Sequence, residues 1–147
     1  MPMPRRAFLT LSLSALAACG RKPAEVPRGE TVYIDRLVDK YAALYDMPPS
    51  LIHRVIRRES GYNAAARNGP YYGLLQILPQ TARQMGYNGP PNGLLDADTN
   101  LRYAGRYLRG AWIVSNGSQD RAVYWFAHGY YYEAKRRGLL QQTGLRS

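Results

Sequence analysis

The sequence has few of the residues that build disulfides or metal sites. Cys19 is the only cysteine, which excludes an intramolecular disulfide and also a cysteine-rich zinc site. The two histidines, His53 and His128, stand 75 positions apart in the sequence, which disfavours a histidine-based metal site. We therefore expect no bound metal and no cofactor.

Acidic residues and long hydrophobic runs are also scarce. The chain has 10 Asp and Glu against 20 Lys and Arg, a formal net charge of +10. A basic surface suits a polyanion such as nucleic acid, anionic lipid or an acidic cell-wall polymer, although surplus arginine also serves solubility. The 13 Tyr and 2 Trp argue against disorder, and the 147 residues suffice for one domain.

The N-terminal residues resemble an export signal. Arg5 and Arg6 precede an apolar stretch at residues 7–18, the layout of a secretory signal, and the adjacent arginines resemble a twin-arginine signal. That stretch is too short to span a bilayer, which requires about 20 residues. Leu-Ala-Ala-Cys at residues 16–19 is similar to a bacterial lipoprotein signal, in which cleavage precedes a cysteine that is then acylated. The alternative is an ordinary signal with an incidental cysteine.

These features predict a signal peptide at residues 1–18, a lipidated Cys19 followed by a tether at 19–29, and a folded domain at 30–147. Pro23, Pro27 and Gly29 are typical of such a tether. We expect the domain to be exported and held by the lipid on Cys19 at the periplasmic face of a bacterial membrane. Gly20 favours the outer membrane weakly.

Apolar residues at three-to-four spacing predict an all-α domain of about five helices with two long loops at residues 61–78 and 86–95. No run alternates with period two for long enough to predict a strand. The expected helices run from residue 30 to 45, from 49 to just before Gly61, from Pro79 to about Met85, from caps at 98–100 to about 116, and from a cap at Asp120 to near Gly138.

One carboxyl lies on the apolar face of its predicted helix. Glu59 follows Ile52, Val55 and Ile56 by seven, four and three positions, so its side chain points with the buried stripe. Burial and the C-terminal end of a helix both disfavour the ionised form, which predicts a raised pKa for Glu59. A carboxyl that is protonated near neutral pH suits a general acid for glycosidic cleavage. The alternative is a structural ion pair with Arg57, Arg58 or Arg67.

Three motifs in this order resemble the catalytic domain of soluble lytic transglycosylases, the lysozyme-like SLT family. They are Glu-Ser-Gly-Tyr-Asn at 59–63, Gly-Leu-Leu-Gln-Ile-Leu-Pro-Gln-Thr-Ala at 73–82, and Asp-Thr-Asn-Leu-Arg-Tyr-Ala-Gly-Arg-Tyr-Leu at 98–108. Each motif is weakly specific alone, whereas the order and spacing of all three are fairly specific. The resemblance covers roughly residues 31–138 and implies a lysozyme-like domain, a monomer, that binds peptidoglycan glycan strands. The export signal argues against nucleic acid as the partner.

The resemblance also implies a reaction. In this family one glutamate, here Glu59, protonates the oxygen between N-acetylmuramic acid and N-acetylglucosamine and then deprotonates the muramyl C6 hydroxyl. That hydroxyl attacks the anomeric carbon and leaves a 1,6-anhydro end. Tyr71 and Tyr72 are expected to stack on saccharide rings, with packing as the alternative for one of them. The remaining implied contacts are Ser60 and Gln76, which orient Glu59 or bond the sugars, and Gly73, which lets the backbone approach them.

The sequence departs from the family pattern in three places. The segment between Ala66 and Gly73 is one residue shorter, and Leu75 replaces a methionine. Phe126 stands at the position of a tyrosine whose hydroxyl would help to hold the glutamate. Without that hydroxyl, the carboxylate of Glu59 has one hydrogen bond fewer, which favours its protonated form. We expect lower activity, unless Tyr124, Tyr130 or Tyr131 supplies the hydroxyl instead.

Two alternative functions therefore stand beside the transglycosylase. One is a hydrolytic muramidase resembling goose-type lysozyme, which requires a second carboxylate to place a water molecule. The other is a peptidoglycan-binding lipoprotein with weakened catalysis, suggested by Phe126. The other acidic residues considered, Asp96, Asp98, Asp120 and Glu133, are expected to be helix caps or solvated charges.

Overall fold

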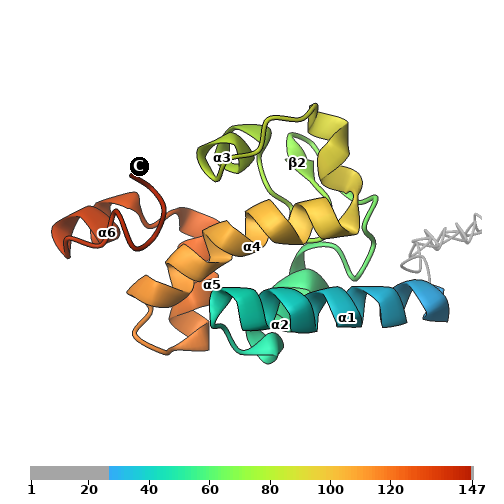
Figure 1. Cartoon of the computed structure of the whole chain (residues 1–147), viewed down its shortest axis with the longest axis horizontal. Helices are drawn as coiled ribbons and strands as arrows, with labels where there is room; N and C mark the ends of the chain where they lie inside the picture. Colours follow the sequence, from blue (N-terminus) through green and yellow to red (C-terminus); the bar gives the residue numbers. More distant parts are fainter. Residues whose placement is uncertain (1–26, 147) are drawn as a thin grey trace, which may run out of the picture.

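A computed structural model describes residues 27–146 of the chain (Figure 1). The predicted signal peptide, the lipidated Cys19 and the tether as far as residue 26 lie outside the described residues. Within the described range, no helix combines the length and the apolar character needed to cross a membrane. The elements are α1 (Arg28–Tyr45), α2 (Pro49–Glu59), β1 (Arg67–Asn68), β2 (Tyr71–Tyr72), α3 (Pro79–Gln84), the 3-10 helix η1 (Pro91–Leu95), α4 (Ala97–Val114), α5 (Gln119–His128) and α6 (Tyr131–Arg136).

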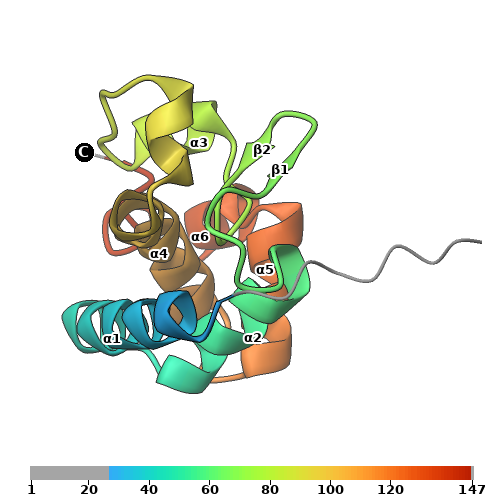
Figure 2. The same cartoon turned by 90° about the vertical axis from the view of Figure 1, so that its right-hand side faces the viewer.

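Helix α4 is the centre of the domain. It packs against α1 along one side and α5 along another, and α3 and η1 also contact it (Figure 1). The hairpin formed by β1 and β2 stands on the same side of the molecule as the end of α2 and α5 (Figure 2). The all-α fold class is thus confirmed. The largest fully buried side chains include Tyr41, Ile34, Leu51, Ile52, Ile56, Leu74, Leu101, Leu108 and Tyr130.

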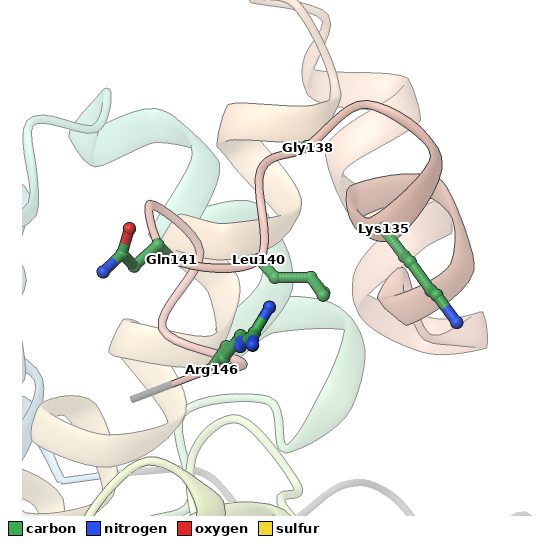
Figure 3. Close-up of a pocket in the computed structure, with 5 residues that line it drawn as sticks. All are labelled: Lys135, Gly138, Leu140, Gln141 and Arg146. Atoms are coloured by element: carbon green, nitrogen blue, oxygen red, sulfur yellow. The ribbon is translucent and has the colours of Figure 1, made fainter.

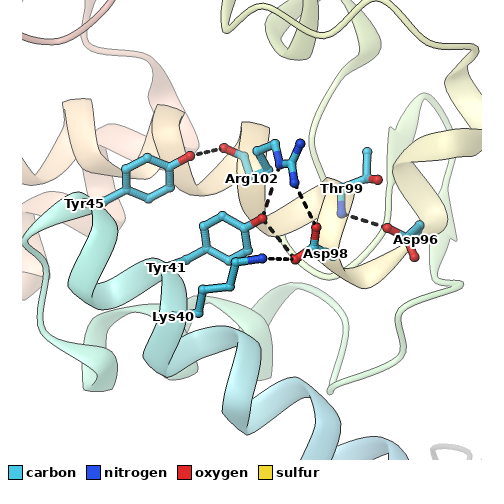
Figure 4. Close-up of polar contacts among 7 residues, drawn as sticks. All are labelled: Lys40, Tyr41, Tyr45, Asp96, Asp98, Thr99 and Arg102. Atoms are coloured by element: carbon cyan, nitrogen blue, oxygen red, sulfur yellow. Dashed lines mark hydrogen bonds and ion pairs between the residues drawn. The ribbon is translucent and has the colours of Figure 1, made fainter.

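A polar cluster fixes α1 against the start of α4 (Figure 4). The Asp98 carboxylate accepts hydrogen bonds from Lys40 Nζ at 2.7 Å and from the Tyr41 hydroxyl at 3.1 Å, and Arg102 Nη2 lies 3.3 Å from its second oxygen. The Tyr45 hydroxyl donates to the Arg102 carbonyl. The bond from Lys40, followed by that from Tyr41, outweighs desolvation and lowers the pKa of Asp98. These contacts set the position of the helix that carries the back of the site.

The first three predicted helices are confirmed, with local reasons for their ends. Helices α2 and α3 begin with Pro49 and Pro79, whose missing amide protons cost nothing at a helix start. Helix α1 ends at Tyr45 and is followed by Asp46, which adopts a left-handed conformation with φ 51°. The helix begins at Arg28, two residues earlier than predicted.

The long helix predicted from Asp120 to near Gly138 is wrong, because the structure divides this segment into α5 and α6. Gly129 between them has φ 83°. The turn lets Tyr130 enter the core, where its ring lies against the backbone of Gly110 and its hydroxyl donates to the Tyr107 carbonyl at 2.8 Å. A straight helix would carry this tyrosine away from that position.

Three further details differ from the sequence-based expectation. Asp96, not residues 98–100, caps α4 by accepting a bond from the Thr99 amide at 2.8 Å. Ser118, not Asp120, caps α5 through the Arg121 amide. The loop predicted at residues 61–78 contains the two-residue strands β1 and β2, paired antiparallel, which are too short to leave a period-two pattern.

Candidate active site

Glu59 is the last residue of α2 and is held at the end of that helix's buried face. Ile52, Val55 and Ile56 are 0–1% exposed, whereas the Glu59 side chain retains 24% exposure. The apolar stripe therefore fixes the helix, and its final turn brings the carboxyl to the surface of a pocket. This half-buried position matches the orientation that the sequence spacing predicts.

The surroundings of Glu59 raise the pKa of its carboxyl. Desolvation by burial is the larger cause, and the nearby positive charge of Arg58 opposes it. Arg58 Nε lies 3.4 Å from Glu59 Oε1, so the ion pair considered from the sequence does form with this residue. The Arg58 side chain is 52% exposed, however, and solvent weakens such a pair. Arg67 instead places its guanidinium over the Tyr72 ring, 4.6 Å from the centroid.

The Glu59 carboxyl faces a pocket of about 250 Å³, formed where the end of α2, the β-hairpin loop and α5 meet. A second chamber of about 230 Å³ shares the wall made by Tyr71, Gln76, Phe126 and Ala127 and continues toward the C-terminal end of α5. Because the two chambers share these four residues, they are adjacent and together form one groove. The first chamber is lined by Arg58, Glu59, Asn68, Tyr71, Gln76, Phe126 and Ala127.

Gln76 forms one wall of the groove in a constrained conformation. Its backbone has φ 49°, which is uncommon for a residue with a side chain. Its side-chain nitrogen donates to the Gly73 carbonyl at 2.8 Å and the Ala66 carbonyl at 3.1 Å, and its oxygen accepts from Asn68 Nδ2 at 3.0 Å. These three bonds hold the loop in one conformation despite the strained backbone of Gln76, as is typical of functional sites.

Asn100, buried on α4, ties this loop to the helix core. Its side-chain oxygen accepts from the Leu75 amide at 2.9 Å, and its nitrogen donates to the Tyr72 and Leu94 carbonyls, both at 2.9 Å. A β-carbon on Gly73, which has φ 75°, would overlap the Asn100 amide and the Leu94 carbonyl. The group that lies close to the Gly73 backbone is therefore the Asn100 side chain behind the groove, and its contact leaves room only for glycine.

The structure brings some of the predicted site residues together and separates others. Tyr71, 43% exposed, and Phe126 join Glu59 and Gln76 in lining the first chamber. Tyr72 is 6% exposed and packs in the core, so packing, the alternative for one tyrosine of this pair, describes it. Two other predicted contacts are not among the residues lining the groove: Gly73, and Ser60, whose hydroxyl donates to the Ile56 carbonyl.

Several residues that line the groove were not predicted from the sequence, among them Asn68, Ala127 and Tyr107. Asn68 lies on β1 and bonds Gln76, Ala127 follows Phe126, and Tyr107 of α4 lines the second chamber. The Tyr107 ring packs on Phe126, with centroids 5.7 Å apart, and burial raises the pKa of its phenol. Its place within the motif at 98–108 was the available signal, but helical spacing alone does not separate a groove tyrosine from a core tyrosine.

Among the residues that line the two chambers, Glu59 is the one with a carboxyl group. The other acidic side chains considered from the sequence have structural partners: Asp96 caps α4, Asp98 joins the α1–α4 cluster, Asp120 lies 2.6 Å from Arg54, and Glu133 pairs with Arg136. A larger pocket of about 510 Å³ lies at the C-terminal segment (Figure 3). Its lining residues carry no acid, and Lys135 comes from α6 whereas Arg146 comes from the C-terminal segment.

A helical domain with a single, partly desolvated carboxyl in an open groove defines a protein suited to acid–base chemistry on an extended substrate. Comparison with protein families gives the more specific identity: the family described as Transglycosylase SLT domain matches residues 36–137. The chain belongs to this family, and the resemblance seen in its motifs is thereby confirmed. The family acts on peptidoglycan and has transglycosylase activity. No solved structure matches the chain.

Proposed function

We propose that the protein is a lytic transglycosylase that cleaves the β-1,4 bond between N-acetylmuramic acid and N-acetylglucosamine, with Glu59 as the single general acid and base. The observation that carries the proposal is the lone carboxyl of the groove, whose pKa is raised by burial. A carboxyl with a raised pKa holds its proton nearer to neutral pH, and so has a proton to give to the leaving sugar oxygen.

The proposed reaction uses this group twice. Protonated Glu59 donates its proton to the glycosidic oxygen as the bond to the anomeric carbon of the muramyl residue breaks. The resulting carboxylate then accepts the proton of the muramyl C6 hydroxyl, whose oxygen bonds to the same carbon. The products are a sugar with a free 4-hydroxyl and a 1,6-anhydromuramyl end, and Glu59 is again protonated. No water is consumed, so no second carboxylate is required to place one.

Other groove residues have supporting roles in this proposal. Tyr71, exposed beside the pocket, is a surface for a sugar ring, and Phe126 adds an apolar wall opposite the hairpin loop. The side-chain nitrogen of Gln76 already donates to two loop carbonyls. Its contribution to sugar binding therefore comes from its side-chain oxygen and from the shape of the loop. Ser60 supports the end of α2 through its bond to Ile56.

Phe126 keeps the binding-only alternative in view. It lines the same pocket as Glu59 and has no hydroxyl to donate to the carboxylate. None of the tyrosines considered as substitutes, Tyr124, Tyr130 and Tyr131, lines either chamber, and the Tyr130 hydroxyl is engaged by the Tyr107 carbonyl. Tyr107 itself supplies a hydroxyl to the second chamber.

Mass analysis of the fragments that the full chain releases from purified peptidoglycan tests the proposal. Anhydromuramyl ends, lighter than reducing ends by one water molecule, are the expected product. Reducing ends would instead identify a hydrolase. Binding to peptidoglycan without release of fragments would support the binding-only protein.

We further propose that the chain is exported and attached by acylated Cys19 to the periplasmic face of a bacterial membrane. The support is the lipoprotein-type sequence at residues 16–19 and the absence of any other cysteine. Metabolic labelling with a fatty acid tests this, and the expected result is a label that the Cys19→Ser variant lacks. A labelled Cys19→Ser chain would contradict it.

A further inference from the structure

An aromatic pocket lies beyond the second chamber, where α5 ends and α6 begins. It has a volume of about 420 Å³ and is lined by Trp125, His128, Tyr131, Tyr132, Glu133 and Arg136, together with Gly129. The family resemblance assigns no substrate contact to these residues, and Tyr131 is considered from the sequence only as a substitute for the hydroxyl that Phe126 lacks. The pocket has the usual character of a ligand site, with large apolar surfaces and a few polar groups.

The two tyrosines of this pocket are exposed to solvent. Tyr132 is 83% exposed and Tyr131 is 46% exposed, which is high for large aromatic side chains. Their ring centroids are 5.3 Å apart and the planes meet at 82°, so the two faces form a corner rather than a flat patch. Aromatic faces of this kind suit the C–H face of a pyranose, because the ring is apolar there and hydroxyls point outward at its edge.

A pair of opposite charges lies beside the tyrosines. Arg136 Nη2 lies 2.7 Å from one oxygen of the Glu133 carboxylate and Arg136 Nε lies 3.1 Å from the other. This bidentate contact lowers the pKa of Glu133. The pair leaves lone pairs on the carboxylate and donors on the guanidinium, which match the hydroxyl and acetamido groups of an N-acetylated sugar.

The pocket continues the groove that begins at Glu59. His128 and Gly129 line both the aromatic pocket and the second chamber, and the second chamber shares four lining residues with the first. The sharp turn at Gly129, with φ 83°, places α6 and its tyrosines at the end of α5. A glycan strand bound against Phe126 and continuing in this direction therefore reaches Tyr131 and Tyr132.

We infer that Tyr131, Tyr132 and the Glu133–Arg136 pair form an additional saccharide-binding subsite for the glycan strand that extends from the catalytic groove. The inference rests on the proposed function for its substrate class. The subsite binds N-acetylated sugar rings remote from the cleaved bond and strengthens the hold on long strands. Short fragments that end within the groove do not reach it.

Binding of the full chain to purified sacculi tests this subsite, with Glu59→Gln present in every protein so that the glycan is not consumed. Tyr131→Ala and Tyr132→Ala are compared with Tyr33→Ala, a matched control because Tyr33 on α1 is 49% exposed and lies outside the three pockets. We expect each test variant to bind about three- to tenfold more weakly, the range for loss of one aromatic contact, and the control to change less than about twofold. Tyr132→Phe, which retains the ring, should bind as the parent does.

A lipid-binding measurement distinguishes the saccharide subsite from a membrane-binding surface. Binding to mixed micelles of neutral detergent and phosphatidylglycerol reports an affinity for anionic lipid, since tyrosines beside arginine also suit a membrane surface. A loss of micelle binding with unchanged sacculus binding in Tyr131→Ala and Tyr132→Ala overturns the saccharide assignment. So does sacculus binding equal to that of Tyr33→Ala.

The proposed function fails separately, on the chain that retains Glu59. If that chain releases anhydromuropeptides while Tyr131→Ala and Tyr132→Ala bind sacculi normally, the subsite is overturned and the enzyme assignment stands. If that chain releases no muropeptides while both variants lose sacculus binding, the subsite is supported but the protein binds glycan without cleaving it, and the enzyme assignment is overturned.

Discussion

Replacing Asn100 by alanine should destabilise the domain strongly, although this residue lies behind the groove and outside its lining. Asn100 is 0% exposed, and its side chain bonds three backbone groups, two in the loop at residues 72–75 and one in η1. The substitution removes the amide oxygen and nitrogen that form these three bonds.

The magnitude follows from the groups left without partners. The Tyr72 carbonyl keeps a bond from the Ile77 amide at 3.1 Å, whereas the Leu75 amide and the Leu94 carbonyl depend on Asn100. A buried polar group without a partner costs about 1–3 kcal/mol, so the free energy of unfolding should fall by about 2–6 kcal/mol. Since a domain is stable by only about 5–15 kcal/mol, a loss of this size is large.

Urea unfolding followed by far-ultraviolet circular dichroism measures this loss. Asn92→Ala is the matched control, because Asn92 lies in the neighbouring η1 but is exposed. We expect the control to change the free energy of unfolding by less than about 0.5 kcal/mol. If Asn100→Ala were as stable as Asn92→Ala, the three bonds would not hold the loop and the account of how the groove wall is built would be refuted.

Three other changes test the physical description of the domain. Gly73→Ala should lower the free energy of unfolding by about 2–4 kcal/mol more than Gly69→Ala does, because both glycines have positive φ but only a β-carbon at Gly73 overlaps its neighbours; equal losses in thermal unfolding would contradict this. Glu59→Gln should stabilise the fold by about 0.5–1 kcal/mol at pH 7, because a raised folded-state pKa means that the ionised carboxylate opposes folding. This gain should vanish below the ordinary pKa of 4.5, where the carboxyl is protonated in both states. A gain that is equal at pH 4 and pH 7 would exclude desolvation as its cause. Asp98→Asn should cost about 1 kcal/mol at pH 7, and because the folded-state pKa of Asp98 is lowered, this cost should shrink as the pH falls through the folded-state pKa, below 3.8; a cost independent of pH in urea titrations would contradict the ion cluster.

Local signals in the sequence account for most of the helices. Pro49 and Pro79 fix helix starts through their own backbone chemistry, and the apolar spacing of α1, α2 and α4 continues through most of each helix. The break at Gly129 could not be predicted in this way. It depends on Tyr130 packing against Gly110, a residue 20 positions earlier, and no helical period records such a contact.

The site was predictable where it depended on one helix and less so where it depended on several. The spacing of Glu59 from the apolar residues of α2 predicts both the direction of its side chain and its partial burial. Asn100 looked like a helix cap because Asn favours that position, yet its role comes from a loop 25 residues away. Tyr107 enters the groove because α4 passes behind α5, which is a property of the packing rather than of the local sequence.

Release of muropeptides by the full chain and by its Glu59→Gln variant tests the central claim most directly. Asp120→Asn is the matched control, because Asp120 is an exposed carboxylate paired with Arg54. The account predicts that the parent and Asp120→Asn release anhydromuropeptides at equal rates, while Glu59→Gln is slower by at least about 100-fold, the usual contribution of a general acid. Release by Glu59→Gln at the parent rate would contradict the assignment of this carboxyl as the catalyst.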